Sequence, residues 1–392
     1  MQRMSKSRFE ALVHSMGTKR KRRRSSSGKQ QVVRMNKARL EALMRHAQQN
    51  KRLRQRRWQQ QQQRRQQQPQ STKAERRYPV WGKRPDVVVD RRPGKGNFTS
   101  IQAAVDAAPS SNPKRYVIYV RAGVYKEAVQ VGKENITMFG DGPTKTIVTG
   151  SRCIATGHDT LQSATFTVTR NGFTAIGMRF ENTGRVGQAV AIRVSSDRAV
   201  FWLCQMWGNQ DTLYVYGGRQ LYRKCDVRGS VDFIFGPGVA VFDRCTAVLR
   251  PRPDGARVLT IMASQKRDGE ANGLVFLNGK VTAPPNTLLR TTFLGRPWGP
   301  DSVMVYINTF MTRVVRSEGW GTWTNDNTWG GRLFMAEYNS MGPGAVQPRV
   351  WFAKPGRLTA LQAVQFLPDR FIQLSSWIRS TGLPSLDYTR TL

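Results

Sequence analysis

A repeat with a period of about 20 residues limits the fold of this chain more than any other feature of its sequence. Cys204, Cys225 and Cys245 recur at this spacing, and Asp232 follows Asp211 at the same interval. Such a period, with several short strands in each repeat, is typical of a parallel β-helix, in which each coil packs only against its neighbours. A β-sandwich also contains short strands, but it gives no reason for matched residues to recur one period apart. We therefore expect an all-β chain that folds as a parallel β-helix.

The same period predicts which polar side chains meet. Residues one coil apart in a β-helix stack at the strand spacing of roughly 4.8 Å. Asp211 and Asp232 should therefore face each other on adjacent coils. Gln188 and Gln210, which are also about one period apart, should line up beside them. Two carboxyl groups and two amides in one place make this the candidate site of the chain.

Short β-rich runs between Gly, Asn and Asp turns fill the chain from Val87 onward. The clearest runs are residues 116–120, 136–139, 165–168, 199–202 and 239–242. An apolar-aromatic pair precedes each repeating cysteine, and we expect these pairs to align from coil to coil. The pairs are Phe201-Trp202, Leu221-Tyr222 and Val241-Phe242. One early helix is predicted over residues 100–108, capped by Ser100 or Thr99.

The N-terminal part of the chain differs from the rest in composition. Residues 1–77 hold 24 Lys and Arg against three Glu, a balance of +21, and residues 55–70 are mostly Gln and Arg. A segment so charged and so poor in apolar residues does not bury a core. We therefore expect a disordered basic tail over residues 1–75 and one folded domain over residues 76–392. The run Lys19–Arg24 is typical of nuclear-targeting or nucleic-acid-binding arms, so nucleic acid is expected to bind only through this tail.

The positive charge narrows the choice of partners but does not decide it. A formal net charge of +38 favours an anionic partner, which is a nucleic acid, an acidic membrane surface or a polyuronate. No stretch reaches the ~18 apolar residues of a membrane span, and we expect no membrane partner. Residues 1–30 contain no apolar segment typical of a secretory signal. None of the four cysteines shows a CxxC spacing, and we expect no metal and no cofactor.

Several short motifs follow one another through the predicted β-helix. They are Gly123-Val-Tyr-Lys-Glu127, Gln188-Ala-Val-Ala191, Gln210-Asp-Thr-Leu-Tyr214, Gly229-Ser-Val-Asp-Phe-Ile-Phe-Gly236, Leu294-Gly-Arg-Pro-Trp298, Glu337-Tyr-Asn339 and Gly342-Pro-Gly-Ala345. In this order and spacing they resemble the motifs of plant pectin methylesterases, from about Val87 to Leu383. The resemblance implies a right-handed parallel β-helix with a short N-terminal helix cap. It also implies a carboxylic ester hydrolase that removes the C6 methyl esters of homogalacturonan, in pectin degradation and cell-wall modification.

The resemblance also assigns the catalytic roles. Asp232 is expected to be the nucleophile that attacks the ester carbonyl. Asp211 is expected to act as general acid toward methanol and then as base for water. Arg296 would keep Asp232 ionised and aimed, because a guanidinium contacts a carboxylate through two N–H groups. The side-chain amides of Gln188 and Gln210 would stabilise the oxyanion.

Further residues are expected to bind the substrate. The resemblance carries Thr160, Gln188, Arg296 and Trp298 over as substrate contacts. The Trp298 ring can stack on a sugar, and Tyr214 and Phe233 are expected to line the same groove, with core packing as the alternative for Phe233. The partners implied are methylated homogalacturonan and a proteinaceous pectinesterase inhibitor, and we expect a monomer.

The sequence features disagree about the compartment in which this protein is located. Plant members of the family have a disulfide at the positions of Cys225 and Cys245, and such a bond persists in an oxidising compartment. The sequons at Asn97 and Asn135 also favour secretion to the cell wall. The basic run at Lys19–Arg24 favours the nucleus, and no signal peptide is visible. We expect the cell wall, with a nuclear or other intracellular location as the alternative.

Two other functions fit part of the sequence. A polygalacturonase or pectate lyase is also a pectin-active β-helix, but the former typically uses a histidine and the latter a cluster of acidic calcium ligands. The chain has only His14, His46 and His158, and no acidic cluster surrounds Asp211. The second alternative, of a different class, is a basic nucleic-acid-binding protein with a catalytically silent β-helix domain. The complete catalytic set argues against it.

Overall fold

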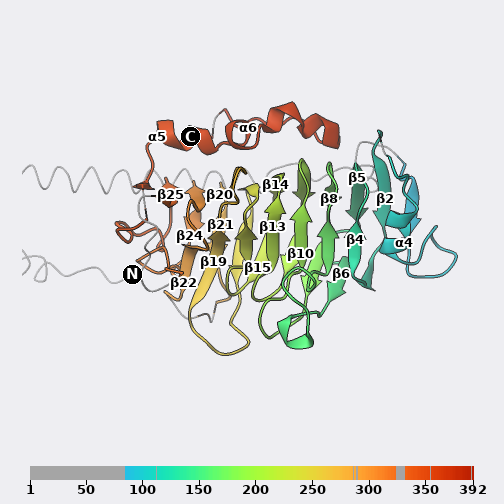
Figure 1. The fold of residues 1–392 in the computed structure, drawn as a ribbon, viewed down its shortest axis with the longest axis horizontal. Helices are drawn as coiled ribbons and strands as arrows, with labels where there is room; N and C mark the ends of the chain where they lie inside the picture. Colours follow the sequence, from blue (N-terminus) through green and yellow to red (C-terminus); the bar gives the residue numbers. More distant parts are fainter. Residues whose placement is uncertain are drawn as a thin grey trace, which may run out of the picture. The chain divides into compact units, whose positions relative to one another are not determined.

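The structure, a computed structural model, describes residues 84–392 except 112, 286, 288, 289, 324–331, 354 and 390. The tail predicted over residues 1–75 lies outside the described residues. Within them the chain winds through three parallel sheets of eleven, seven and eight strands. Figure 1 shows the coils stacked side by side along one axis. The predicted right-handed parallel β-helix is confirmed.

Each sheet takes one strand from each successive coil. The eleven-stranded sheet contains β1 (Val87–Val89), β2 (Tyr116–Val120), β5 (Ile136–Gly140), β8 (Thr174–Ile176), β11 (Ala199–Trp202), β14 (Arg219–Arg223), β17 (Val239–Asp243), β20 (Gly273–Leu277), β23 (Val303–Ile307), β25 (Phe334–Tyr338) and β26 (Pro355–Arg357). The eight-stranded sheet contains β3 (Gly123–Lys126), β6 (Thr146–Gly150), β9 (Arg179–Asn182), β12 (Gln205–Trp207), β15 (Asp226–Gly229), β18 (Thr246–Leu249), β21 (Lys280–Thr282) and β24 (Phe310–Met311). The seven-stranded sheet contains β4 (Val129–Val131), β7 (Phe166–Val168), β10 (Ile192–Ser195), β13 (Leu213–Gly217), β16 (Ile234–Gly236), β19 (Leu259–Ser264) and β22 (Thr292–Pro297).

Columns of like residues fill the interior of the solenoid. The rings of Phe201, Tyr222 and Phe242 stack with centroids 4.9 and 4.7 Å apart, close to the strand spacing. The predicted alignment of Trp202 with Tyr222 is wrong by one residue, since Trp202 pairs with Arg223. The inward position is three residues before each cysteine. Trp202 lies only two residues before its cysteine and therefore faces outward, because side chains alternate along a strand.

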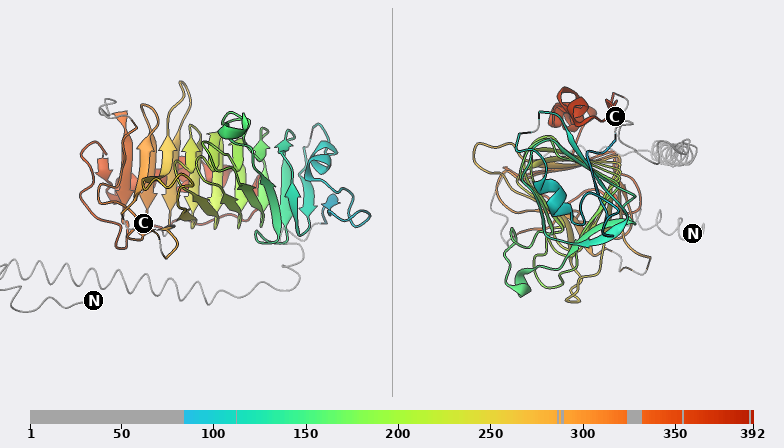
Figure 2. Two further views of the ribbon diagram at one scale, coloured as in Figure 1. Left: turned by 90° about the horizontal axis from the view of Figure 1, so that it is seen from below. Right: turned by 90° about the vertical axis from the view of Figure 1, so that its right-hand side faces the viewer.

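A short helix covers the N-terminal end of the solenoid. Helix α4 (Ile101–Asp106) packs against β1, β2 and β4, and its N-cap Ser100 accepts a hydrogen bond from the N–H of Ala103. Glu127, the last residue of the first motif, accepts from the N–H groups of Ile101 and Gln102. A carboxylate at a helix N-terminus satisfies donors that have no partner within the helix. The predicted helix is confirmed, and Figure 2 shows it across the end of the coils.

C-terminal helices cover the outer face of the eleven-stranded sheet (Figure 1). They are α5 (Ala360–Ala363), η3 (Val364–Phe366), α6 (Pro368–Phe371), η4 (Leu374–Ser376) and η5 (Ile378–Thr381). Ile372 and Trp377 from this segment are buried in one cluster with outward residues of the strands, such as Val200 and Leu221. The helical segment therefore protects apolar side chains that a β-helix would otherwise expose. A single-turn η1 (Ile154–Thr156) lies in the loop between β6 and β7.

A fully buried ion pair ties the last coils together. Glu337 of the Glu-Tyr-Asn motif and Arg349 have side chains that are only 2% and 1% exposed, and Arg349 Nε donates to Glu337 Oε1 at 2.6 Å. Arg349 also donates to the carbonyls of Arg316, Ser317 and Gly344. Burying a charge costs much free energy unless the charge is paired and hydrogen-bonded in this way.

We predict that Glu337→Gln destabilises the domain by about 3–5 kcal/mol, because it leaves the Arg349 charge buried without a counter-ion. Urea denaturation followed by tryptophan fluorescence measures the loss. The control is Arg332→Gln, which removes an ion pair with Asp301 at the surface. That variant should leave the midpoint unchanged, since exposed pairs contribute little. Equal shifts in the two variants would contradict the role given to the buried pair.

Candidate active site

Two aspartates begin neighbouring strands of the seven-stranded sheet. Asp211 lies just before β13 and Asp232 just before β16, and the pairing of Leu213 with Ile234 places them on adjacent coils. The backbone N–H of Asp211 donates to the carbonyl of Val231 at 3.0 Å. The predicted stacking of the two aspartates is confirmed. Both have a left-handed backbone, with φ of 62° and 47°, a conformation that aspartate adopts more readily than most residues.

The two glutamines stack in the same way. Gln188 and Gln210 form a parallel β-bridge, as their spacing in the sequence predicts. Both side chains are partly exposed, whereas Asp211 and Asp232 are 7% and 3% exposed. The amides therefore lie at the mouth of the site, where each can donate two hydrogen bonds to a ligand.

Arg296 reaches Asp232 from the strand two places along the sheet. It lies on β22, and its Nε donates to Asp232 Oδ1 at 2.9 Å while its Nη2 donates to Asp232 Oδ2 at 2.5 Å. This two-point contact fixes the plane of the carboxylate as well as its charge. Trp323 covers the guanidinium, and Arg296 Cζ lies 4.3 Å from the centroid of the Trp323 ring. Trp323 is missing from the residues predicted from sequence, although it follows the Leu-Gly-Arg-Pro-Trp motif by one further coil.

Burial and neighbouring charges give the two aspartates different pKa values. Desolvation raises the pKa of Asp211 well above its ordinary value, and the negative charge of Asp232 raises it further. Desolvation also raises the pKa of Asp232, but there the hydrogen bonds and charge of Arg296 act in the opposite direction. The arrangement holds Asp211 as the more strongly protonated partner and Asp232 as the carboxylate that a guanidinium stabilises.

Aromatic side chains form one wall of the site. The rings of Tyr214 and Phe235 stack at 4.2 Å, and Trp298 lies 6.5 and 5.9 Å from them. The prediction that Phe233 lines this groove is wrong, because its side chain is fully buried in the interior core. Phe235, two residues further along the same motif, occupies the outward position instead.

Two glycines of the motif that contains Asp232 allow Phe233 to pack inward and Phe235 to face the groove. A Cβ on Gly229 would lie 2.1 Å from the Cβ of Phe233, which folds back over it. Gly236 has a φ of 137°, and a Cβ there would lie 2.0 Å from the carbonyl oxygen of Val215. Only glycine fits either position, so the motif fixes the backbone on both sides of Asp232.

Thr160 lies in the loop between β6 and β7. Its carbonyl accepts a hydrogen bond from the Ser163 hydroxyl, and that hydroxyl accepts from the N–H of Val190. Asn182 Nδ2 donates to the carbonyls of Ser163 and Val190, both at 3.0 Å. The loop is thus tied to the Gln-Ala-Val-Ala segment of Gln188. Asn182 is a positioning residue that the motifs did not identify.

Cys225 and Cys245, for which a disulfide is predicted, are both buried free thiols in the structure. The two cysteines do stack, with the N–H of Cys225 3.4 Å from Cys245 Sγ. Their thiols bond to main-chain carbonyls instead, Cys225 to Phe201 and Cys245 to Tyr222, each at 3.3 Å.

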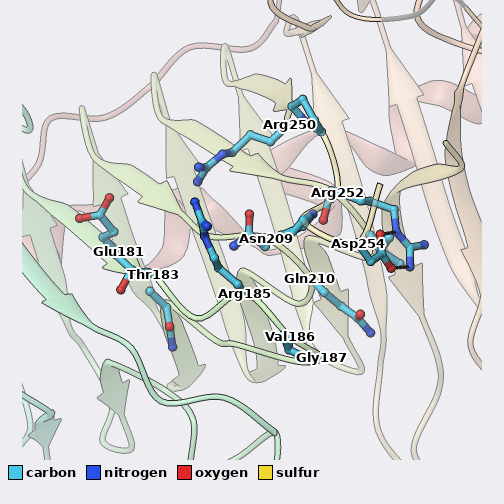
Figure 3. Close-up of a pocket in the computed structure, with 15 residues that line it drawn as sticks. Glu181, Thr183, Arg185, Val186, Gly187, Asn209, Gln210, Arg250, Arg252 and Asp254 are labelled. Atoms are coloured by element: carbon cyan, nitrogen blue, oxygen red, sulfur yellow. Dashed lines mark hydrogen bonds and ion pairs between the residues drawn. The ribbon is translucent and has the colours of Figure 1, made fainter. Parts of the chain in front are cut away.

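A cavity of about 680 Å³ opens beside the catalytic pair (Figure 3). It begins at Gln210 and Val231, which directly precede the two aspartates, and Arg185, Arg250 and Arg252 line its far part. Desolvation raises the pKa of Asp232, and the positive charge of Arg252 opposes this rise together with Arg296. The three arginines lie outside the quoted motifs, and sequence reasoning missed them.

The described residues contain no group of three or more His, Cys, Asp and Glu side chains that could hold a metal ion. No helix within this part of the chain has both the length and the apolar character to cross a membrane. What the site offers chemically is an oriented carboxylate, a protonated carboxyl group and two amide donors. This set can attack an acyl carbon, protonate a leaving group and stabilise an oxyanion.

Comparison with known sequences identifies relatives over most of the folded domain. The profile of the Pectinesterase family matches residues 86–375. Pectinesterase 2 of Citrus sinensis is 39% identical over 331 residues, which cover 78% of this chain and 63% of the relative. "Probable pectinesterase/pectinesterase inhibitor 58" of Arabidopsis thaliana is 40% identical over 77% of this chain and 54% of its own length. The chain thus spans less than two thirds of these relatives.

Comparison with solved structures finds the same fold. A pectin methylesterase from carrot superposes with a TM-score of 0.73 at 34% identity, covering 81% of this chain and 99% of the carrot chain. A pectin methylesterase in complex with a hexasaccharide has a TM-score of 0.65 at 26% identity, covering 78% of this chain and all of the other.

We predict that the Asp211 carboxyl titrates well above its ordinary range. The substitution Asp232→Asn should lower the pKa of Asp211, which should still stay above its ordinary value. The substitution removes the negative neighbour, but desolvation remains. Carbon-13 NMR titration of the aspartate carboxyl groups measures both values. Asp254 is the internal control, because hydrogen bonds from Arg252 lower its pKa to about 2. An Asp211 carboxyl that titrates at its ordinary value in the unsubstituted protein would refute the assignment of the proton.

Proposed function

This chain belongs to the pectinesterase family, and from that premise we propose that it hydrolyses the C6 methyl esters of homogalacturonan to free carboxylates and methanol. The observation that carries the proposal is the two-point contact of Arg296 with Asp232, one coil away from Asp211, whose pKa is raised by burial. A carboxylate is a weak nucleophile unless it is held ionised and aimed. Arg296 supplies both conditions.

In the first half of the reaction, Asp232 attacks the ester carbonyl carbon. The carbonyl oxygen becomes an oxyanion, which accepts hydrogen bonds from the side-chain amides of Gln188 and Gln210. The C–O bond to the methoxy group then breaks, and Asp211 gives its proton to the departing oxygen so that methanol leaves. The product is an acyl-enzyme in which Asp232 forms a mixed anhydride with the galacturonate carboxyl.

In the second half, water replaces methanol. Asp211 is now a carboxylate and accepts a proton from the water as that water attacks the galacturonate carbonyl of the anhydride. Collapse of the tetrahedral intermediate breaks the anhydride C–O bond, restores Asp232 as a carboxylate beside Arg296 and releases the sugar as a carboxylic acid, which gives the second proton of the water to solvent and becomes galacturonate. Asp211 keeps the proton and is ready for the next ester. Atoms and charges balance over the two halves.

The groove around the pair suits a polyuronate. Trp298 and Trp323 offer apolar ring faces for the faces of sugar rings, and Tyr214 and Phe235 extend this surface. Arg267 lies over the ring of Tyr216 at 4.0 Å and adds positive charge beside the same aromatic cluster. Thr160 and Gln188 are proposed as further contacts. The related pectin methylesterase that binds a hexasaccharide supports a polysaccharide ligand.

The remaining assignments follow from the family. We place the catalytic domain at residues 76–392 and the working compartment at the cell wall, outside the cell. A proteinaceous pectinesterase inhibitor is a candidate partner, and the names of several relatives join the two activities. The monomeric state stays a prediction. The prediction of nucleic-acid binding concerns the tail, which lies outside the described residues.

We predict that Asp232→Ala abolishes methanol release and leaves the fold intact, because the variant loses the nucleophile. Methanol is measured by a coupled alcohol-oxidase assay on methylated pectin, and circular dichroism checks the fold. Reducing ends are measured in parallel. Their release without methanol by the unsubstituted chain would assign the site to chain cleavage and refute the esterase.

We predict that Arg296→Lys lowers turnover by about tenfold or more and moves the acidic limb of the pH–rate profile to higher pH. Lysine keeps the charge but loses the two-point contact. The lowering of the Asp232 pKa by Arg296 is then weaker, so Asp232 becomes ionised only at higher pH. An unshifted acidic limb would show that Arg296 acts only as a distant charge.

A further inference from the structure

The turn that carries Asp211 is held by a side-chain hydroxyl that the proposed reaction does not use. Thr212 follows Asp211 directly and is fully buried. Its Oγ1 donates to the carbonyl of Arg228 at 3.0 Å and lies 3.3 Å from the carbonyl of Asn209. Asn209 belongs to the same turn, whereas Arg228 lies on β15 in the next coil. The hydroxyl therefore joins the turn of Asp211 to the strand that leads toward Asp232.

The two aspartates occupy turns of the same shape, but different side chains support them. Each aspartate has a left-handed backbone and follows a glycine by three positions. In the turn of Asp211, a Cβ on Gly208 would lie 2.6 Å from Thr212 Oγ1, so the hydroxyl packs over the glycine. In the turn of Asp232, the place of Thr212 is taken by Phe233, which is fully buried in the core. A core ring therefore supports Asp232, whereas a hydroxyl group supports Asp211.

The Thr212 hydroxyl is not required to satisfy either of the carbonyls that it contacts. The carbonyl of Asn209 also accepts from the N–H of Ser230, at 2.9 Å. The carbonyl of Arg228 also accepts from the N–H of Gly208, at 3.0 Å. Loss of the hydroxyl would therefore leave neither buried carbonyl without a donor, which is the costly outcome of losing a hydrogen bond. What the hydroxyl adds is a restraint on the shape of the turn.

The position of Asp211 in this turn decides how well it can hold and deliver a proton. Desolvation raises its pKa most, the charge of Asp232 adds to the rise, and the charge of Arg296 opposes it. All three effects depend on the depth of the carboxyl group and on its distance from the other two residues. A turn that relaxed toward solvent would weaken both effects that keep the carboxyl protonated, and it would move the proton away from the departing methoxy oxygen.

We propose that Thr212 is a positioning residue for Asp211, because its hydroxyl bridges two coils and fixes the left-handed turn that aims the general acid at the leaving group. The inference rests on the proposed function. Thr212 is fully buried and therefore does not contact a polymer in the groove, so it acts only through Asp211. Replacement by valine keeps the shape of the side chain and removes the hydroxyl, whereas replacement by serine keeps the hydroxyl.

Turnover measurements on the full chain test this role. Thr212→Val should lower kcat by about ten- to a hundredfold with KM unchanged, because a misplaced general acid weakens only the chemical step. The alkaline limb of its pH–rate profile should move to lower pH, since an Asp211 with a lower pKa loses its proton earlier as the pH rises. Thr212→Ser should keep most of the turnover. A Thr212→Val enzyme with the kcat of the unsubstituted chain would overturn the proposal.

Thr309→Val is the matched control. Thr309 is also fully buried, and its hydroxyl also contacts carbonyls on two coils, those of Ile307 at 3.1 Å and Phe276 at 3.3 Å. It lies between β23 and β24, outside the seven-stranded sheet, so the substitution removes the same kind of hydrogen bond away from the site. This variant should keep the kcat and the pH–rate profile of the unsubstituted chain. Equal changes in Thr212→Val and Thr309→Val would overturn the proposal, because the loss of any bridge between coils would then have the same effect.

Carbon-13 NMR titration of Asp211 separates this inference from the proposed function, because it does not depend on turnover. The pKa of Asp211 should fall in Thr212→Val and stay unchanged in Thr212→Ser and Thr309→Val. If the unsubstituted chain releases no methanol, the esterase proposal fails, and this titration still decides whether Thr212 positions Asp211. An unchanged pKa in a folded Thr212→Val chain would overturn the role.

A second variant keeps the test decisive if the added methyl group of valine prevents folding. Thr212→Ala also lacks the hydroxyl but adds no atoms to the buried turn, so it carries the same expectations for kcat and for the pKa of Asp211. Circular dichroism checks the fold of each variant before these measurements.

Discussion

Hydrogen bonding between parallel strands one coil apart fixes nearly every functional distance in this protein. The register that pairs Leu213 with Ile234 also sets Asp211 beside Asp232, and the bridge between Gln188 and Gln210 repeats it one coil earlier. Because the backbone holds the strands at roughly 4.8 Å, the side chains need no flexible adjustment to meet. The catalytic pair is thus a consequence of the solenoid, as much as of the residues themselves.

The same geometry creates an electrostatic problem that Arg296 resolves. Two carboxyl groups buried on adjacent coils cannot both ionise easily, since desolvation raises both pKa values and the charge of Asp232 raises that of Asp211 further. A guanidinium that contacts only Asp232 breaks the symmetry of the pair. In the proposed reaction one aspartate serves as nucleophile and the other carries the proton, although their backbone environments are nearly equivalent.

Features far from the candidate site stabilise the solenoid that positions the two aspartates. Glu127 caps the helix at one end of the solenoid, and the Glu337–Arg349 pair closes the coils at the other. The C-terminal helices bury the outer face of the eleven-stranded sheet, and the candidate site lies on the seven-stranded sheet.

The sequence alone determined the period, and with it the β-helix and the stacked aspartates and glutamines, because a solenoid repeats its chemistry at a fixed spacing. It also predicted one early helix, over residues 100–108, where the structure has residues 101–106. Its motifs also identified Arg296 as the partner of Asp232. Only the tertiary structure decided which side chains face inward. Phe233 enters the core and Phe235 the groove, Trp202 faces outward, and the Cys225 thiol bonds to a carbonyl. These outcomes depend on left-handed turns and strand register that shift a residue between faces by a single position. The arginine-lined cavity beside the pair was equally beyond the sequence, because Arg185 and Arg250 lie on different coils, far apart in the chain, and only the fold brings them together.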